Sequence, residues 1–165
     1  MKPLVALVLL LSATAALAAE KKQGISISFD SNDARTKIAA RHVARDAKLA
    51  VGTRNGAAVV LLTNDVVAVQ LTDAVLARIE PKSDANFIEE LVAAGVGVAV
   101  RKAVEYPVAN IRSAEIRNGM LVLTNDDGKP VFADLKVNGE NVTHDLATAD
   151  AAKFVNAFRA IKTRR

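Results

Sequence analysis

Cysteine and tryptophan are absent from the sequence, and tyrosine occurs only once, as Tyr106. Without cysteine the chain forms no disulfide and carries no lipid on a cysteine behind an export signal. Only 4% of the residues are aromatic, so few side chains can supply interface binding energy or stack on nucleic-acid bases. The sequence therefore argues against a disulfide-stabilised domain, a lipoprotein and a nucleic-acid-binding protein.

Catalytic motifs are missing as well. The serine signature Gly-x-Ser-x-Gly does not occur, and the only histidines are His42 and His144. Either histidine would suit a general base at neutral pH, so a small hydrolase-type enzyme stays open as an alternative. His144, Asp145 and Asp150 carry metal-binding atoms, but their spacing matches no ligand motif. We predict no metal and no cofactor, and we identify no catalytic residue.

The first 18 residues have the pattern of a cleavable secretory signal peptide. Lys2 gives a positive start, Leu4 to Leu11 is an unbroken apolar run, and Ala16-Leu17-Ala18 places small residues where a signal peptidase cuts. A membrane anchor is the alternative, but a span needs about 20 apolar residues. We therefore expect cleavage after Ala18 and a soluble periplasmic or secreted protein.

The mature chain, residues 19–165, has a size and composition that suit a single domain. Losing Lys2 with the signal leaves 21 basic and 18 acidic side chains, a net charge of +3. This balance is too mild to argue for or against an anionic partner. A hydrophobic share of 51% excludes wholesale disorder, and about 150 residues can bury an adequate core without disulfides.

The first half of the mature chain predicts a strand, a helix and a hairpin. Residues 25–29 alternate apolar and polar side chains, as a half-buried strand does. Residues 34–51 contain no Gly or Pro, follow a capping cluster that ends at Asp33, and precede Gly52, which predicts a helix. The apolar stretches 57–63 and 66–72 predict a buried hairpin. Residues 73–79 fit either a short helix or continued strand.

A second helix is expected over residues 86–105, ended by Pro107. Its centre, residues 91–100, carries no charge and contains Gly95 and Gly97. A helical stretch that is apolar on every side must be enclosed by protein or lipid. Burial in the core is the leading interpretation, and self-association or contact with a membrane surface is the alternative.

The last third of the chain predicts a meander of four antiparallel strands followed by a helix. The strand candidates are 109–117, 120–124, 131–137 and 141–145. They are separated by turns that contain Asn-Gly or Asp-Gly, the strongest short-range hairpin signals. Thr148 is the expected cap of the final helix. The predicted fold is thus α+β: a mostly antiparallel sheet, built from a hairpin and a four-strand meander, packed against two or three helices including the C-terminal one.

Two segments resemble each other weakly. Arg54-Asn55-Gly56 leads to Leu62-Thr63-Asn64-Asp65, and Arg117-Asn118-Gly119 leads likewise to Leu123-Thr124-Asn125-Asp126. Each copy is expected to follow a helix, so a duplicated unit over 32–72 and 86–137 would explain the similarity. Chance similarity of hairpin turn chemistry explains it equally well.

The one concentrated basic surface belongs to the helix expected over residues 34–51. Its members are Lys37, Arg41, Arg45 and Lys48. Facing phosphate or a carboxylated glycan, such a face would bind through salt-sensitive attraction. A solvated helix face is the simpler alternative.

We therefore expect an exported, non-enzymatic binding or interaction protein of unknown ligand. Its expected partner is an anionic envelope component or another protein, and not a nucleic acid. Two alternatives stay open: a hydrolase-type enzyme using His42 or His144, and an envelope-associated protein that forms homo-oligomers through the apolar helix 91–100.

Overall fold

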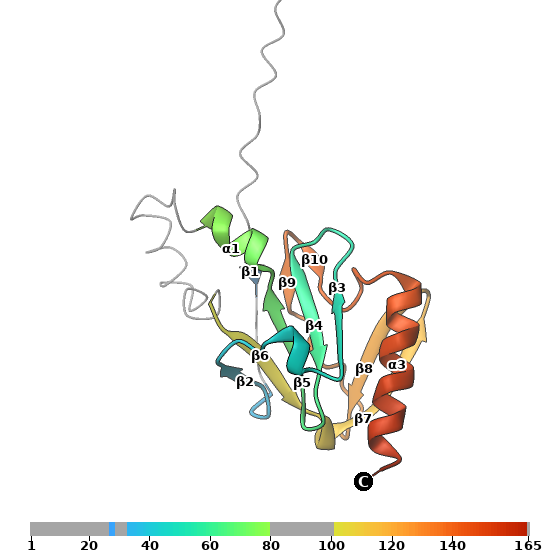
Figure 1. Ribbon diagram of the computed structural model, residues 1–165. Coiled ribbons are helices and arrows are strands. Elements are labelled where there is room, and N and C mark those ends of the chain that lie inside the picture. The colour runs from blue at the N-terminus through green and yellow to red at the C-terminus, as the bar shows by residue number, and fades with distance from the viewer. Residues whose placement is uncertain (1–26, 29–32, 80–100, 165) are drawn as a thin grey trace, which may run out of the picture.

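The computed structural model describes residues 27–28, 33–79 and 101–164 (Figure 1). The expected signal peptide and residues 86–100 of the expected second helix lie outside the described residues. The described part has an α+β architecture in which antiparallel strands pack with a C-terminal helix. Within it, no helix is both long and apolar enough to cross a membrane.

The elements follow one another in a simple order. The strands are β1 (Ile27–Ser28), β2 (Lys37–Ala39), β3 (Leu49–Gly52), β4 (Ala58–Leu62), β5 (Val66–Leu71), β6 (Ala103–Pro107), β7 (Ile111–Arg117), β8 (Met120–Asn125), β9 (Lys136–Val137) and β10 (Glu140–Asn141). The helices are α1 (Asp73–Ile79) and α3 (Thr148–Lys162), with short 3-10 helices η1 (Ala44–Asp46) and η2 (Val108–Asn110). Residues 73–79, which fit either structure in the sequence, are thus helical.

A five-stranded antiparallel sheet in the order β2-β6-β5-β4-β3 forms the centre of the fold. The predicted hairpin is confirmed as β4 and β5, joined by a tight turn in which the Thr63 N–H donates to the Val66 carbonyl at 2.9 Å. Nearly every residue of these two strands is buried. Strands that are apolar on both sides need cover on both faces of the sheet, and two different parts of the chain provide it.

The helix predicted over residues 34–51 is wrong. The chain forms β2, η1 and β3 there instead. β2 pairs with β6, and β3 pairs with β4, at opposite edges of the sheet. Pairing with strands that are already buried satisfies the backbone and outweighs the helix propensity of the many alanines, which is only a weak preference.

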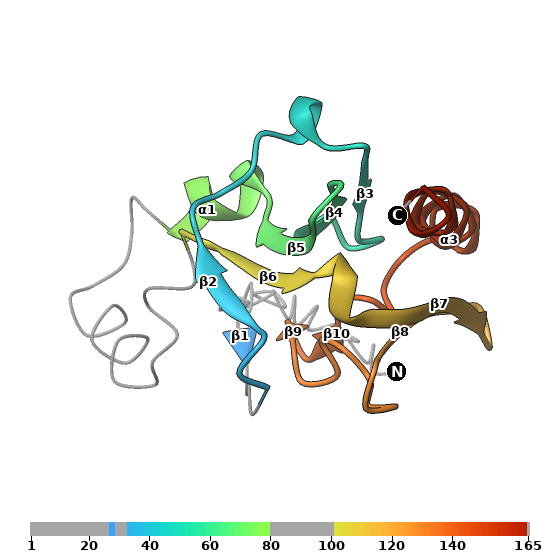
Figure 2. The same cartoon turned by 90° about the horizontal axis from the view of Figure 1, so that it is seen from below.

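Residues 40–48, here called the strap, cross one face of the five-stranded sheet from β2 to β3 (Figure 2). Ala47 of the strap packs against a small buried cluster of Leu61, Ala68 and Ala103. The alanine-rich pattern that suggested a helix face therefore serves close packing of an irregular segment on the sheet. This is the cover for one of the two faces.

The C-terminal end of the second predicted helix is also wrong. Residues 103–107 form β6, the strand between β2 and β5. Val104 and Tyr106 point into the main core, and Ala103 packs on the strap side. A central strand position with partners on both edges again decides the conformation of a segment whose local pattern favoured a helix.

The last third of the chain forms hairpins, but not a four-strand meander. β7 and β8 pair through Asn118-Gly119, with φ of 52° and 77°, as a type I′ turn requires. β9 and β10 pair through Asn138-Gly139, and β9 also pairs with β1. These strands belong to two separate sheets, so the predicted turns are confirmed and the predicted meander is wrong.

The strand predicted over 131–137 is reduced to Lys136–Val137, and that over 141–145 is reduced to its first residue, at the end of β10. Phe132 is buried in the left-handed region with φ of 60°, which breaks the alternation of a strand. The side-chain amide of Asn141 donates to the Phe132 carbonyl at 2.9 Å and to the Ala133 carbonyl at 2.7 Å. This amide holds the segment in a turn.

The predicted C-terminal helix is confirmed as α3, although its N-cap is Ala147 rather than Thr148. Its buried stripe contains Ala151, Phe154, Val155 and Phe158. α3 contacts both β3 and β7 and lies at one side of the molecule (Figure 2). It closes the main core, which covers the sheet face opposite the strap.

The two similar segments both lie at hairpin turns. Residues 54–56 lie between β3 and β4, and residues 118–119 connect β7 to β8. The first copy follows a strand and not the expected helix. A duplication of 32–72 and 86–137 stays a prediction.

Candidate functional site

The strap is anchored on the sheet by a buried glutamine. The His42 N–H donates to Gln70 Oε1 at 2.9 Å, and Gln70 Nε2 donates to the His42 carbonyl at 3.0 Å. Gln70 lies on β5, and its side chain thus pairs with the backbone as a neighbouring strand would. Both polar ends of the amide are hydrogen-bonded, so its burial carries little desolvation penalty.

Two further contacts fix the strap at the same end. His42 Nε2 lies 2.6 Å from Glu105 Oε1 on β6. Arg41 donates to the Leu71 carbonyl at 2.8 Å and to Asp73 at 2.6 Å, at the start of α1. The strap is an irregular segment held in place by side chains of three different elements.

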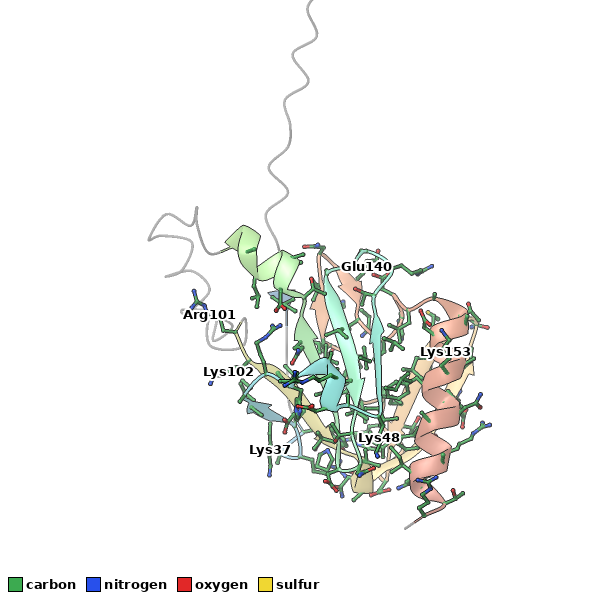
Figure 3. The ribbon with its side chains drawn as sticks, in the orientation of Figure 1. Lys37, Lys48, Arg101, Lys102, Glu140 and Lys153 are labelled. Carbon is green, nitrogen blue, oxygen red and sulfur yellow. The ribbon has the colours of Figure 1, made fainter. Side chains whose placement is uncertain are left out.

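The four basic residues singled out from the sequence do not share a helix face. Lys37 lies on β2, Arg41 and Arg45 lie on the strap, and Lys48 ends it. Arg41 is committed to the contacts with Leu71 and Asp73, whereas Lys37, Arg45 and Lys48 are exposed. Figure 3 labels Lys37 below β2, Lys48 before the start of β3, and Lys153 on α3. The structure thus divides the four into one anchoring residue and three surface cations.

Two exposed apolar side chains accompany these cations. Ile38 on β2 is 46% exposed and Val43 on the strap is 52% exposed. Single exposed apolar residues are ordinary on protein surfaces. Here both belong to the same short stretch of chain as the exposed cations Lys37, Arg45 and Lys48.

A second polar region lies at the start of β2. Asp33, Arg35, Tyr106, Asn125 and Asp127 line a recess of about 400 Å³. Asp33 accepts hydrogen bonds from Arg35 Nε at 2.8 Å, from the Tyr106 hydroxyl at 2.9 Å and from the Asn125 amide at 3.1 Å. Arg35 also donates to Asp127 and lies over the Tyr106 ring, 5.7 Å from its centroid.

This network shifts the titration of its members. The hydrogen bonds from the Arg35 guanidinium hold the pKa of Asp33 well below its usual range, and those from Tyr106 and Asn125 add to the effect. Burial raises the pKa of Tyr106 to about 12. The donors from Tyr106 on β6 and Asn125 at the end of β8 fasten the residues before β2 to both strands.

The two histidines lie in different parts of the fold, His42 on the strap and His144 after β10. The His42 and Glu105 pair resembles an oriented general base, but neither histidine lines the recess. His144 is exposed, and Asp145 accepts from Arg54 Nε at 3.1 Å. Among the described residues, no three His, Asp or Glu side chains gather closely enough to hold a metal ion.

No protein-family model matches the sequence, and neither a curated protein nor a solved structure is similar to it. Functional inference therefore depends on the chain's own residues. The Gln70 anchor and the Asp33 network were both missed in the sequence. The only available signals were a polar glutamine inside an apolar strand and a single tyrosine, and neither indicates a partner.

Proposed function

We propose that this chain is an exported, non-enzymatic binding protein, and that the strap and β2 contact an anionic component of the cell envelope. One observation carries the proposal: an irregular, exposed segment is pinned to the sheet by buried side chains while it presents cations to solvent. Binding residues are commonly placed on such loops, because a rigid scaffold then positions them at little entropic cost.

The charge balance around the strap supports an anionic partner. Two nearby carboxylates are already engaged, Asp73 by Arg41 and Glu105 by His42. Asp46 lies 3.6 Å from Arg45, but both side chains are largely exposed, 69% and 85%. Such surface pairs are weak, so Arg45 can exchange Asp46 for a stronger anionic partner.

The test compares two variants with the same change in net charge. Arg45→Glu/Lys48→Glu alters the strap, and Lys136→Glu/Lys153→Glu alters surfaces away from it. Binding is measured by sedimentation with phosphatidylglycerol or phosphatidylcholine vesicles and by retention on alginate, at about 0.05 and 0.5 M salt. We expect binding to one anionic probe that weakens with salt and is lost only in the strap variant. Equal losses in both variants would reject the strap as the site.

Export is tested separately by mass spectrometry of the protein from a host cell. We expect a chain that begins at Ala19, in the periplasm or the medium.

The enzymatic alternative has its own test, a hydrolase substrate panel. An activity abolished by His42→Gln or His144→Gln would support an enzyme and contradict the non-enzymatic proposal.

A further inference from the structure

A groove lies between the C-terminal half of α3 and the first half of β7, at the side of the molecule opposite β2 (Figure 1). Its volume is about 340 Å³, within the range of small-molecule sites. Its floor includes Ala114 and Phe158, which are buried in the main core. Its walls carry Arg112, Arg159 and Lys162.

A β-bulge places Arg112 at this groove. In the pairing of β7 with β8, Ile111 faces Asn125 and Ser113 faces Thr124, so Arg112 is the extra residue. A bulge redirects a side chain and is frequent beside binding sites. Arg112 is exposed, between the buried Ile111 and the half-buried Ser113 of a strand that contacts α3.

The residues that line the groove include more cationic side chains than carboxylates. In the described part of the chain, neither Arg112 nor Arg159 has a carboxylate within 4.0 Å. Among the described residues, Lys162 donates to the carbonyls of Val108 and Ala109, both at the long distance of 3.4 Å.

Of the described residues that line the groove, Glu115 is the one acidic side chain, and its carboxylate is bonded to Arg117. Arg117 donates to its carboxylate from Nε at 3.0 Å and from Nη2 at 2.8 Å. These bonds lower the pKa of Glu115, and the charge of Arg159 adds to the effect. Within the described part of the chain, two guanidinium groups and one ammonium group therefore line a recess whose carboxylate is already bonded to Arg117.

We propose that this groove binds a phosphate monoester group, with Arg112 and Arg159 as its main ligands and Lys162 as a third cation. A guanidinium group presents its N–H donors in a planar fork that fits phosphate oxygens. A dianion matches the charge excess better than a carboxylate. Ser113 and Thr163 line the same recess, and the Thr163 hydroxyl donates to the Arg159 and Ala160 carbonyls at 3.2 Å.

The test is a titration of the ¹⁵N-labelled full chain followed by NMR. The probes are inorganic phosphate, phenyl phosphate and monomeric dihexanoyl phosphatidic acid, with benzoate for comparison. We expect saturable shifts of the Ser113 and Thr163 amides with at least one phosphate probe. The preferred probe then distinguishes a soluble phosphoester from a lipid headgroup.

Variants give the result that decides the proposal. Arg112→Gln/Arg159→Gln should weaken phosphate binding by roughly ten-fold or more, and Arg112→Lys should weaken it less. Lys153→Gln, on α3 outside the groove, should leave it unchanged. Unsaturable shifts, equal affinity in the double variant, or a preference for benzoate would overturn the proposal. Retained binding in Arg45→Glu/Lys48→Glu separates this groove from the strap, and amide spectra show that each variant is folded.

Discussion

Replacing Gln70 with methionine removes the anchor of the strap while keeping a long, unbranched side chain in the core. Two hydrogen bonds to the His42 backbone are lost, at 2.9 and 3.0 Å. Each contributes about 0.5–1.5 kcal/mol net. His42 is half-buried, so water can reach its freed backbone groups and no separate desolvation penalty is added; the two bonds together give about 1–3 kcal/mol. Methionine adapts to the space, which limits any packing penalty.

Hydrogen exchange is the suitable assay because the anchor acts locally. We expect the His42 amide to exchange about ten-fold to hundred-fold faster in Gln70→Met, since 1.4 kcal/mol corresponds to a factor of ten. The Val60 amide in β4 reports on global opening and serves as the internal reference. Arg45→Gln, a change in the strap outside its anchors, should leave His42 protected. An unchanged His42 rate in Gln70→Met would refute the anchoring role.

Three further changes test the fold. Asp33→Asn should destabilise the protein at neutral pH. Because the native pKa of Asp33 is lowered, the difference in unfolding free energy between variant and parent should shrink only as pH falls below about 4. Urea midpoints between pH 3 and 7 measure this difference. Tyr106→Phe should cost about 1 kcal/mol of unfolding free energy by removing one donor to Asp33, and a larger loss in Asp33→Asn than in Tyr106→Phe is required. Phe154→Ala, in a fully buried position of α3, should cost about 3–5 kcal/mol in urea unfolding, whereas a loss below 1 kcal/mol would contradict its place in the core.

Local signals predicted the hairpins and the last helix, because these elements depend on neighbouring residues. Asn118-Gly119 and Asn138-Gly139 adopt the positive φ values that a two-residue hairpin turn requires. The apolar stripe of α3 is a property of its own sequence. Such features survive in any tertiary context that leaves the turn exposed and the stripe buried.

The strap could not be predicted, because its conformation is set by residues far away in the chain. Gln70 and Glu105, which hold His42, are 28 and 63 residues distant from it. The alanines of residues 34–51 fit both a helix face and close packing on a sheet. The local pattern of residues 34–51 favours a helix. The pairing of β2 with β6, which the local pattern does not contain, makes that prediction wrong.

The same reasoning applies to the candidate sites. The sequence pattern placed Lys37, Arg41, Arg45 and Lys48 on one helix face, whereas the structure places them on β2 and the strap. The groove cations, Arg112, Arg159 and Lys162, come from two elements that meet only in the folded chain. Their arrangement depends on a bulge in β7, for which the sequence carries no distinct signal.

The conformation of residues 34–51 is the basis of the proposed binding surface, and NMR tests it most directly. We predict ¹³Cα chemical shifts that are extended at 37–39 and 49–52, together with nuclear Overhauser contacts between the His42 amide and the Gln70 side chain. A continuous run of helical ¹³Cα shifts from 34 to 51 without those contacts would contradict it.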